Sequence, residues 1–218
     1  MTPWSPAIHS AYSAWMWAAI VGLGVFHGIN PAMGWLFAVA LGLYRKSRRV
    51  VLLALVPIAL GHALAAGLML AAGLSLSAAI GHTMLNRVCG ALLIGWAIWH
   101  WVRGHKMRSR VGMQTGFAGL AASSFAMAGS HGAGLMLIPV LMPTCNALAA
   151  GGTGTPSIAL LAFAALLLHS AAMLATIGAI SLAVFDWWGL GGLRTKWVNF
   201  DLLWTGTLAL CGVLQLGA

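Results

Sequence analysis

Apolar residues gather in six long stretches along this chain, with polar residues concentrated between them. The stretches cover about residues 13–43, 50–74, 84–102, 113–142, 157–185 and 198–216. A hydrocarbon layer of about 30 Å needs about 20 apolar residues in one helix, and runs of this length are typical of transmembrane helices. The pattern therefore predicts an all-α, polytopic membrane protein with six transmembrane helices in a single domain, residues 1–218.

Two of the stretches are longer than a membrane requires. At 1.5 Å per residue, residues 13–43 would form a straight helix of about 45 Å. Each long stretch contains a glycine-rich interruption, HGINPAMG in the first and GSHGAG in the fourth. Irregular backbone inside a membrane is tolerated where protein or a water-filled cavity satisfies its polar groups. We therefore expect broken first and fourth helices, with breaks or gates at Gly28, Pro31, Gly34, Gly129, Gly132 and Gly134.

Polar residues recur in the same order in the two halves of the chain. The first half has His27, His62 and Asn86-Arg87, and the second has His131, His169, and Asn199 with Asp201. Three spans per half would place the second copy upside down in the membrane. The order predicts a 3+3 inverted repeat, with repeats at about 13–102 and 113–216. That architecture is typical of secondary transporters with a site near the midplane.

Composition and charge agree with a membrane location. The chain is 61% hydrophobic and 6% charged, whereas soluble domains carry about a quarter charged residues. Ten of the eleven Lys and Arg residues fall within 45–49, 103–110 and 194–196, and such clusters mark cytoplasmic loops. We expect a bacterial inner-membrane protein with both termini outside. Its basic loops would lie in the cytoplasm against anionic lipid, with membrane lipid rather than nucleic acid as the partner.

Two smaller motifs read as structural. Asp186 stands beside two tryptophans in FDWWGLGG, which is typical of an interfacial anchor. The dipeptide Cys-Gly occurs at Cys89-Gly90 and again at Cys211-Gly212. Small residues in membrane helices favour close helix packing, so we interpret both dipeptides as packing positions.

Four histidines lie inside the apolar stretches: His27, His62, His131 and His169. An ionisable side chain in hydrocarbon costs several kcal/mol, which favours a shared use. Neutral imidazole binds Ni, Co, Cu and Zn and also relays protons; alternatively, each ring hydrogen-bonds a carbonyl and holds two helices together. Beside His27, Asn30 offers a carbonyl oxygen and Met33 a thioether. Imidazole with thioether suits Cu(I), although Met is also a common core filler.

The first half resembles the nickel/cobalt efflux (NicO) family within the LysE-type exporter superfamily. In that family a His in the first span is followed by Pro-Gly-His-Gly, and a second span with a (S/T)HTL element follows a basic loop. Here HGINPAMG matches at His27, Pro31 and Gly34, and the basic YRKSRR precedes GHALA with His62. Met33 stands where the family has its second His. The resemblance implies metal export, with His27 and His62 as metal contacts.

These observations predict a secondary transporter, not an enzyme, that exports a transition-metal cation (Ni, Co or Cu) through a histidine-lined midplane site. The chain has no P-loop and only two carboxylates, so we expect an ion or proton gradient to drive transport. Two alternatives stay open. One is a haem b-binding or accessory subunit of a larger membrane complex, with paired histidines as axial ligands. The other is an exporter of a small organic solute. Assembly into a homo-oligomer or a larger membrane complex also stays open.

Overall fold

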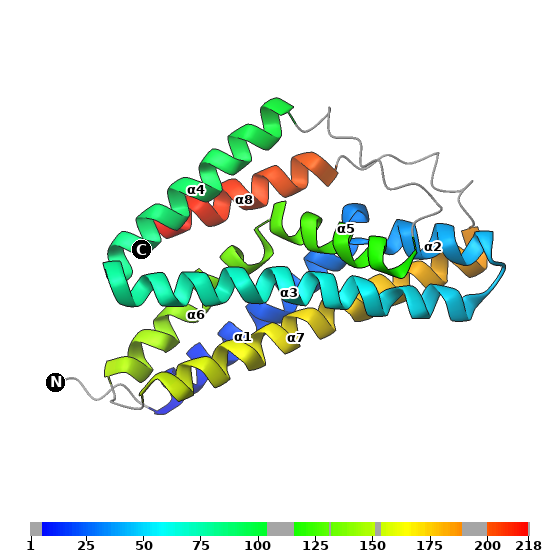
Figure 1. Ribbon diagram of the computed structural model, residues 1–218. Coiled ribbons are helices and arrows are strands. Elements are labelled where there is room, and N and C mark those ends of the chain that lie inside the picture. The colour runs from blue at the N-terminus through cyan, green and yellow to red at the C-terminus, as the bar shows by residue number, and fades with distance from the viewer. Residues whose placement is uncertain (1–5, 104–115, 131, 151–153, 189–199, 218) are drawn as a thin grey trace.

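The computed structural model describes residues 6–103, 116–130, 132–150, 154–188 and 200–217, and the chain is helical throughout these ranges apart from short connections (Figure 1). The first half contains α1 (Pro6–Ile29), a 3₁₀ turn η1 (Pro31–Met33), α2 (Trp35–Tyr44), α3 (Arg48–Ile80) and α4 (His82–Arg103). The second half contains α5 (Phe117–Ser130), α6 (Ala133–Ala150), α7 (Gly154–Ala183), a π-helical turn η3 (Val184–Trp188) and α8 (Phe200–Gly217). The all-α prediction is confirmed.

Each predicted apolar stretch corresponds to helix, but two expected connections were wrong. Residues 75–83 were expected as a loop; instead α3 continues to Ile80 and α4 begins at His82. Gly81 makes the turn between them with φ +77. Residues 143–156 were also expected as a loop, yet α6 runs to Ala150 and α7 begins at Gly154. The helical parts of these two segments include Ala78, Ala79, Ala147, Ala149 and Ala150. Ala has the highest helix propensity of any residue, which favours helix over a loop there.

The first predicted break is present, between α1 and α2. Pro31 has no N–H and so cannot continue the helical hydrogen-bond ladder; the His27 carbonyl instead accepts the Asn30 N–H at 3.2 Å. Gly34 then takes φ +121, a backbone conformation that favours glycine. The α2 helix starts from this residue, and the Ala38 N–H donates to the Gly34 carbonyl at 3.0 Å.

The second break separates α5 from α6, whose axes differ by 53°. Gly132 supplies the turn with φ +66. Its N–H donates to the Gly129 carbonyl at 3.2 Å, and its carbonyl accepts the Met136 N–H at 3.1 Å. Both long apolar stretches are therefore interrupted by a glycine in a left-handed conformation.

Two helices are long and apolar enough to cross a membrane by themselves, over Arg48–Leu76 and Ile158–Trp187. The bent pair α5 and α6 adds a third candidate span if it is counted as one. Shorter apolar helices cover Ala14–Ile29, Trp35–Tyr44 and Arg87–Trp99. Large apolar side chains such as Leu60, Leu64 and Leu68 are exposed along α3. These features indicate an all-helical, membrane-associated protein with two to three candidate spans.

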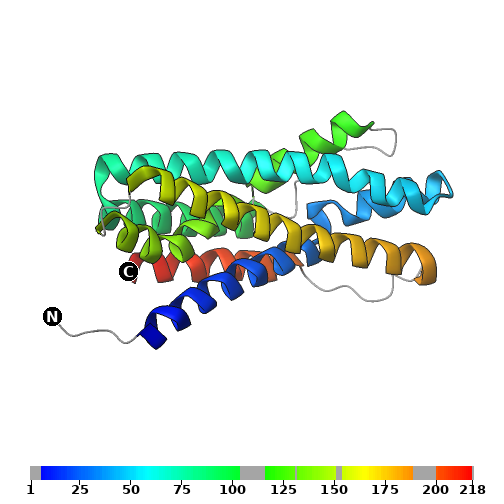
Figure 2. The same cartoon turned by 90° about the horizontal axis from the view of Figure 1, so that it is seen from below.

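Helices of the first half of the chain pack mainly against helices of the second half. α1 lies along α7, α5 lies along α3, and α4 lies along α8, while α3 and α7 pass side by side through the middle (Figures 1 and 2). Glycines permit these close contacts. A Cβ added to Gly24 of α1 would lie 2.4 Å from the His169 carbonyl oxygen of α7, and one added to Gly61 of α3 would lie 2.1 Å from the Ala121 carbonyl oxygen of α5.

The two Cys-Gly dipeptides meet where α4 and α8 pack together. A Cβ on Gly90 would lie 2.8 Å from the Gly212 carbonyl oxygen, and one on Gly212 would lie 2.9 Å from the Gly90 carbonyl oxygen. The contact is reciprocal, with each glycine facing the backbone of the other. The interpretation of these dipeptides as helix-packing positions is confirmed.

An ion pair joins two segments at one end of the bundle. Arg48, at the start of α3, donates to Asp186 of η3 at 2.7 Å. The start of α1 and the end of α8 lie toward the opposite end (Figure 1). The acidic residue expected as an interfacial anchor thus faces a cation of the first basic segment.

Candidate functional site

Three of the four predicted histidines converge in the interior. His27 of α1, His62 of α3 and His169 of α7 are buried, with 0%, 1% and 0% of their surface exposed. Their ring centroids lie 5.7 Å apart for His27 and His62, 4.9 Å for His27 and His169, and 5.6 Å for His62 and His169. We call these three residues the histidine cluster. It gathers three imidazoles from three helices that are far apart in the sequence.

The cluster lies deep within the candidate spans. His62 is midway along the apolar stretch Arg48–Leu76, and His169 is well inside Ile158–Trp187. His27 is in the last turn of α1, directly before the first break. The break therefore brings the end of a half-helix to the middle of two continuous helices.

Hydrogen bonding assigns the tautomer of His27. Its Nδ1 lies 2.9 Å from the Leu23 carbonyl oxygen, and a carbonyl only accepts, so Nδ1 carries the hydrogen. The lone pair of the neutral ring is then on Nε2. An imidazole that donates one N–H to a backbone carbonyl and presents its other nitrogen is the usual arrangement of a metal-binding histidine.

The ring nitrogens of His62 and His169 make no hydrogen bond within the described chain. Both ring nitrogens of each residue are buried and lack a partner at hydrogen-bond geometry; the Ile20 backbone is near the His169 ring but falls outside that geometry. A buried donor without a partner costs about 1–3 kcal/mol. Such a cost is usually offset by a bound species or retained for a function.

The spacing of the rings fits a small bound ion. Imidazole nitrogens bind late transition metals at about 2 Å, which puts the centroids of two rings sharing one ion about 5 Å apart. In the orientations seen, however, no group of three or more described His, Cys, Asp or Glu side chains is placed so that it could hold a metal. The His62 and His169 rings are nearly parallel, at 19°, while His27 is steeply inclined to both, at 75° and 78°. Three donors would converge only after a ring turns about its broad χ2 torsion.

Asn30 and Met33, the other predicted ligands, lie in the first break. Both are buried, with 7% and 2% of their surface exposed. Met33 packs in an apolar cluster that includes Ile58, four residues before His62, and Met173, four residues after His169. Met33 therefore lies on the side of the histidine cluster that faces the Arg48 end of α3, where it fills the core beside the cluster.

The predicted break glycines divide into two groups. Gly34 and Gly132 have the positive φ that a turn requires. Gly28 and Gly134 instead lie within helices at close approaches, since an added Cβ would be 2.6 Å from Thr176 Cβ and 2.5 Å from the Ala66 carbonyl oxygen respectively. Gly129 is also helical and has more room, with Met69 Cε 3.7 Å away.

His131, the fourth predicted histidine, lies outside the described residues. The adjoining Gly132 faces Leu93 of α4 and Leu208 of α8. Leu23 and Phe26 of α1 pack against the same apolar cluster. The second break thus lies next to the α4–α8 pair.

Two tryptophans serve the helix breaks, and sequence reasoning missed both. The Trp35 indole Nε1–H donates to the Ile29 carbonyl at the end of α1, at 3.0 Å. The Trp96 indole Nε1–H donates to the Ser130 carbonyl at the end of α5. The last carbonyls of a helix have no partner within it, so each indole satisfies one of them. The nearest available signal was the position of Trp35 directly after the glycine of its break.

Comparison with protein-family models, with curated protein sequences and with solved structures finds no match to this chain. The resemblance of its first half to the nickel/cobalt efflux family therefore stays a prediction.

Proposed function

We propose that this protein is a secondary membrane transporter that exports a transition-metal cation through the histidine cluster. The observation that carries the proposal is the meeting of His27, His62 and His169 in the interior, with ring centroids 4.9–5.7 Å apart. Ionisable residues at this depth in a membrane protein usually mark a substrate or proton pathway. Neutral imidazole is a common ligand of Ni, Co and Cu.

The packing pattern supports a 3+3 inverted repeat. If a twofold axis related α1–α4 to α5–α8, contact of α1 with α7 would require contact of α5 with α3, and both are present. The axis would also pair α3 with α7 and α4 with α8, as found. Residues on such an axis contact their own counterparts. His62 with His169 and Gly90 with Gly212 have this reciprocal relation.

The broken helices support the placement of the site. In transporters with inverted repeats, discontinuous helices form the substrate site near the midplane. Here α1 ends two residues after His27, so the break is part of the site rather than remote from it. Movement of α1 relative to α3 and α7 would change the distance of His27 from the other two rings.

We also propose that the Arg48 end of the bundle is cytoplasmic. The ion pair between Arg48 and Asp186 holds the first basic segment beside residue 186. Residue 186 precedes the third basic segment, 194–196, in the sequence. Positive charge accumulates on cytoplasmic loops, and both described termini of the helical bundle lie toward the other end (Figure 1). Six crossings would produce this arrangement.

The number of rings favours an ion over haem. Axial ligands lie as a pair on opposite sides of a haem iron, with the porphyrin between them. In the histidine cluster three rings lie within 4.9–5.7 Å of one another, so a porphyrin between any two of them would displace the third. An absorbance spectrum of the purified protein distinguishes the two readings, because bound haem gives a Soret band.

Transport by purified protein in proteoliposomes tests the proposal. We expect Ni(II), Co(II) or Cu(I) to move across the vesicle membrane with the wild-type protein, and the His62→Ala and His169→Ala variants to lose that flux. His82→Ala, at the first residue of α4, is the matched control and should retain it. If all three metals fail to cross, or if both cluster variants transport at the wild-type rate, the proposal is wrong.

A further inference from the structure

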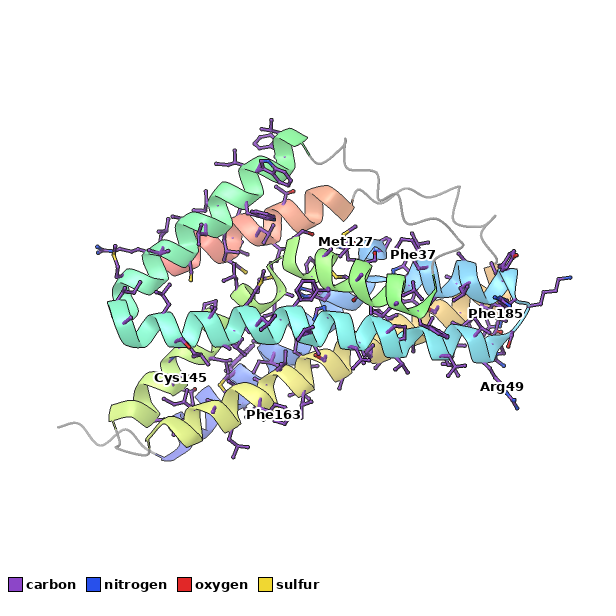
Figure 3. The ribbon with its side chains drawn as sticks, viewed as in Figure 1. Phe37, Arg49, Met127, Cys145, Phe163 and Phe185 are labelled. Carbon is purple, nitrogen blue, oxygen red and sulfur yellow. The ribbon has the colours of Figure 1, made fainter. Side chains whose placement is uncertain are left out.

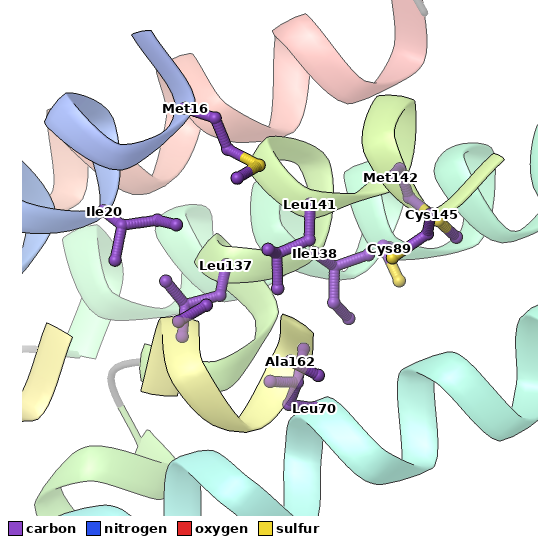
Figure 4. Close-up of a cluster of buried hydrophobic side chains, with 11 residues drawn as sticks. Met16, Ile20, Leu70, Cys89, Leu137, Ile138, Leu141, Met142, Cys145 and Ala162 are labelled. Atoms are coloured by element: carbon purple, nitrogen blue, oxygen red, sulfur yellow. The ribbon is translucent and has the colours of Figure 1, made fainter. Parts of the chain in front are cut away.

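A second set of soft donor atoms lies apart from the histidine cluster. Cys89 of α4 and Met142 and Cys145 of α6 are each 4% exposed and belong to one buried cluster (Figure 4). Met142 and Cys145 are three residues apart and so share a face of α6, and α4 packs against α6. We call these three residues the sulfur cluster. Cysteines 89 and 145 are both free thiols.

The position of the sulfur cluster relates it to the histidine cluster. In Figure 3, Cys145 lies toward the opposite end of the bundle from Arg49 and Phe185. The same buried cluster reaches Ala165, four residues before His169 on α7, a separation of about 6 Å along a helix. The sulfur atoms therefore lie beyond the histidine cluster, on the side away from the basic end.

The chemistry of the sulfur cluster selects one class of ligand. Thiolates and thioethers favour Cu(I) over harder divalent ions. The other members of the same buried cluster are apolar, and the chain has only two Asp or Glu residues, one of which, Asp186, pairs with Arg48. Structural Zn(II) sites take four protein donors, mostly thiolate and imidazole, whereas this cluster offers two thiols and one thioether, and a thioether favours Cu(I).

Met16 is not counted among the donors. Its sulfur atom accepts a hydrogen bond from the Thr144 hydroxyl at 3.2 Å. This contact ties α1 to α6 beside the sulfur cluster. The Met16 sulfur therefore has a structural use.

We infer that Cys89, Met142 and Cys145 form a metal site, specific for Cu(I), on the side of the histidine cluster that faces away from Arg48. When Cu(I) binds, one thiol loses its proton to solvent and a copper–thiolate bond forms, with no change in oxidation state. The second thiol and the thioether complete the coordination. The site itself stands apart from the proposed function; that its ion is the transported cargo rests on that function.

Titration of the purified full-length protein with Cu(I), under reducing conditions and against a chromophoric chelator, tests the inference. We expect the Cys89→Ala/Cys145→Ala variant to bind one Cu(I) fewer than wild type and to lose the ultraviolet copper–thiolate band. Cys211→Ala is the matched control, since Cys211 packs in a different apolar cluster, and it should keep both. Met142→Leu conserves volume and should weaken this binding by about tenfold.

The remaining outcomes separate the two sites. A His62→Ala/His169→Ala variant should keep the copper–thiolate band, so failure of the histidine cluster leaves the sulfur cluster measurable. Retained helical circular dichroism and a monodisperse elution profile show that each variant is folded. Wild-type Cu(I) stoichiometry in folded Cys89→Ala/Cys145→Ala, or displacement of Cu(I) by equimolar Zn(II), overturns the inference.

Discussion

Replacing His62 with leucine should stabilise the metal-free protein while removing metal binding at the histidine cluster. A neutral imidazole has one N–H donor and one acceptor nitrogen, and both nitrogens of His62 are buried without a hydrogen-bond partner in the described chain. A buried donor that makes no hydrogen bond lowers the stability by about 1–3 kcal/mol. Leucine has a similar volume and no polar atom, so we expect the free energy of unfolding to rise by about 1–3 kcal/mol.

Unfolding in mixed micelles, followed by tryptophan fluorescence, measures this change. The chain has eleven tryptophans, which give a strong signal. Ni(II) or Co(II) at one hundred times its dissociation constant should stabilise the wild-type protein by about 2.7 kcal/mol, and His62→Leu should show much less of this gain. Met173→Leu is the control: Met173 is fully buried on α7, and a volume-conserving change there should cost less than about 1.5 kcal/mol.

One result would refute the reasoning. If metal-free His62→Leu is less stable than wild type by more than about 1 kcal/mol, the ring is hydrogen-bonded in the protein, and its buried nitrogens no longer argue for a bound ion.

Three further changes test the helix breaks and the helix packing. Gly34→Ala should destabilise the protein by about 2 kcal/mol, because φ is +121 at this position and the new Cβ would lie 2.8 Å from Ile58 Cδ1. A lower midpoint of unfolding would measure the loss of stability. Trp35→Phe removes the indole donor from the last turn of α1 and should cost about 1–3 kcal/mol, with hydrogen exchange increasing at the break but not at α8. Gly212→Val should push α8 away from Gly90, costing about 1–3 kcal/mol; unchanged cross-linking between engineered cysteines on α4 and α8 would contradict this.

The sequence predicted the features that depend on local composition. Apolar runs too long for one span, interrupted by glycine and proline, indicated both helix breaks. Histidines within apolar runs indicated a buried polar site, and three of them, His27, His62 and His169, meet in the structure. The repeated Cys-Gly pair indicated helix packing, because a small residue in an apolar helix has few other uses.

Features that depend on tertiary contacts could not be predicted in this way. The indole of Trp96 donates to the Ser130 carbonyl on α5, 34 residues away, and no local sequence pattern predicts that bond. Cys89 and Cys145 have no metal-ligand spacing in the sequence, since α4 and α6 bring them into one cluster only after folding. The ends of α3 and α6 were misplaced because uncharged, Ala-rich segments form helix as readily as connections.

The indole bonds at the two breaks have a consequence for how the protein moves. Trp35 and Trp96 each hold the carbonyl at the end of a half-helix. Trp35 is buried, with 5% of its surface exposed, so withdrawing its indole would leave the Ile29 carbonyl in an apolar surrounding unless solvent takes its place. We therefore expect any rearrangement at the first break to bring water to that carbonyl.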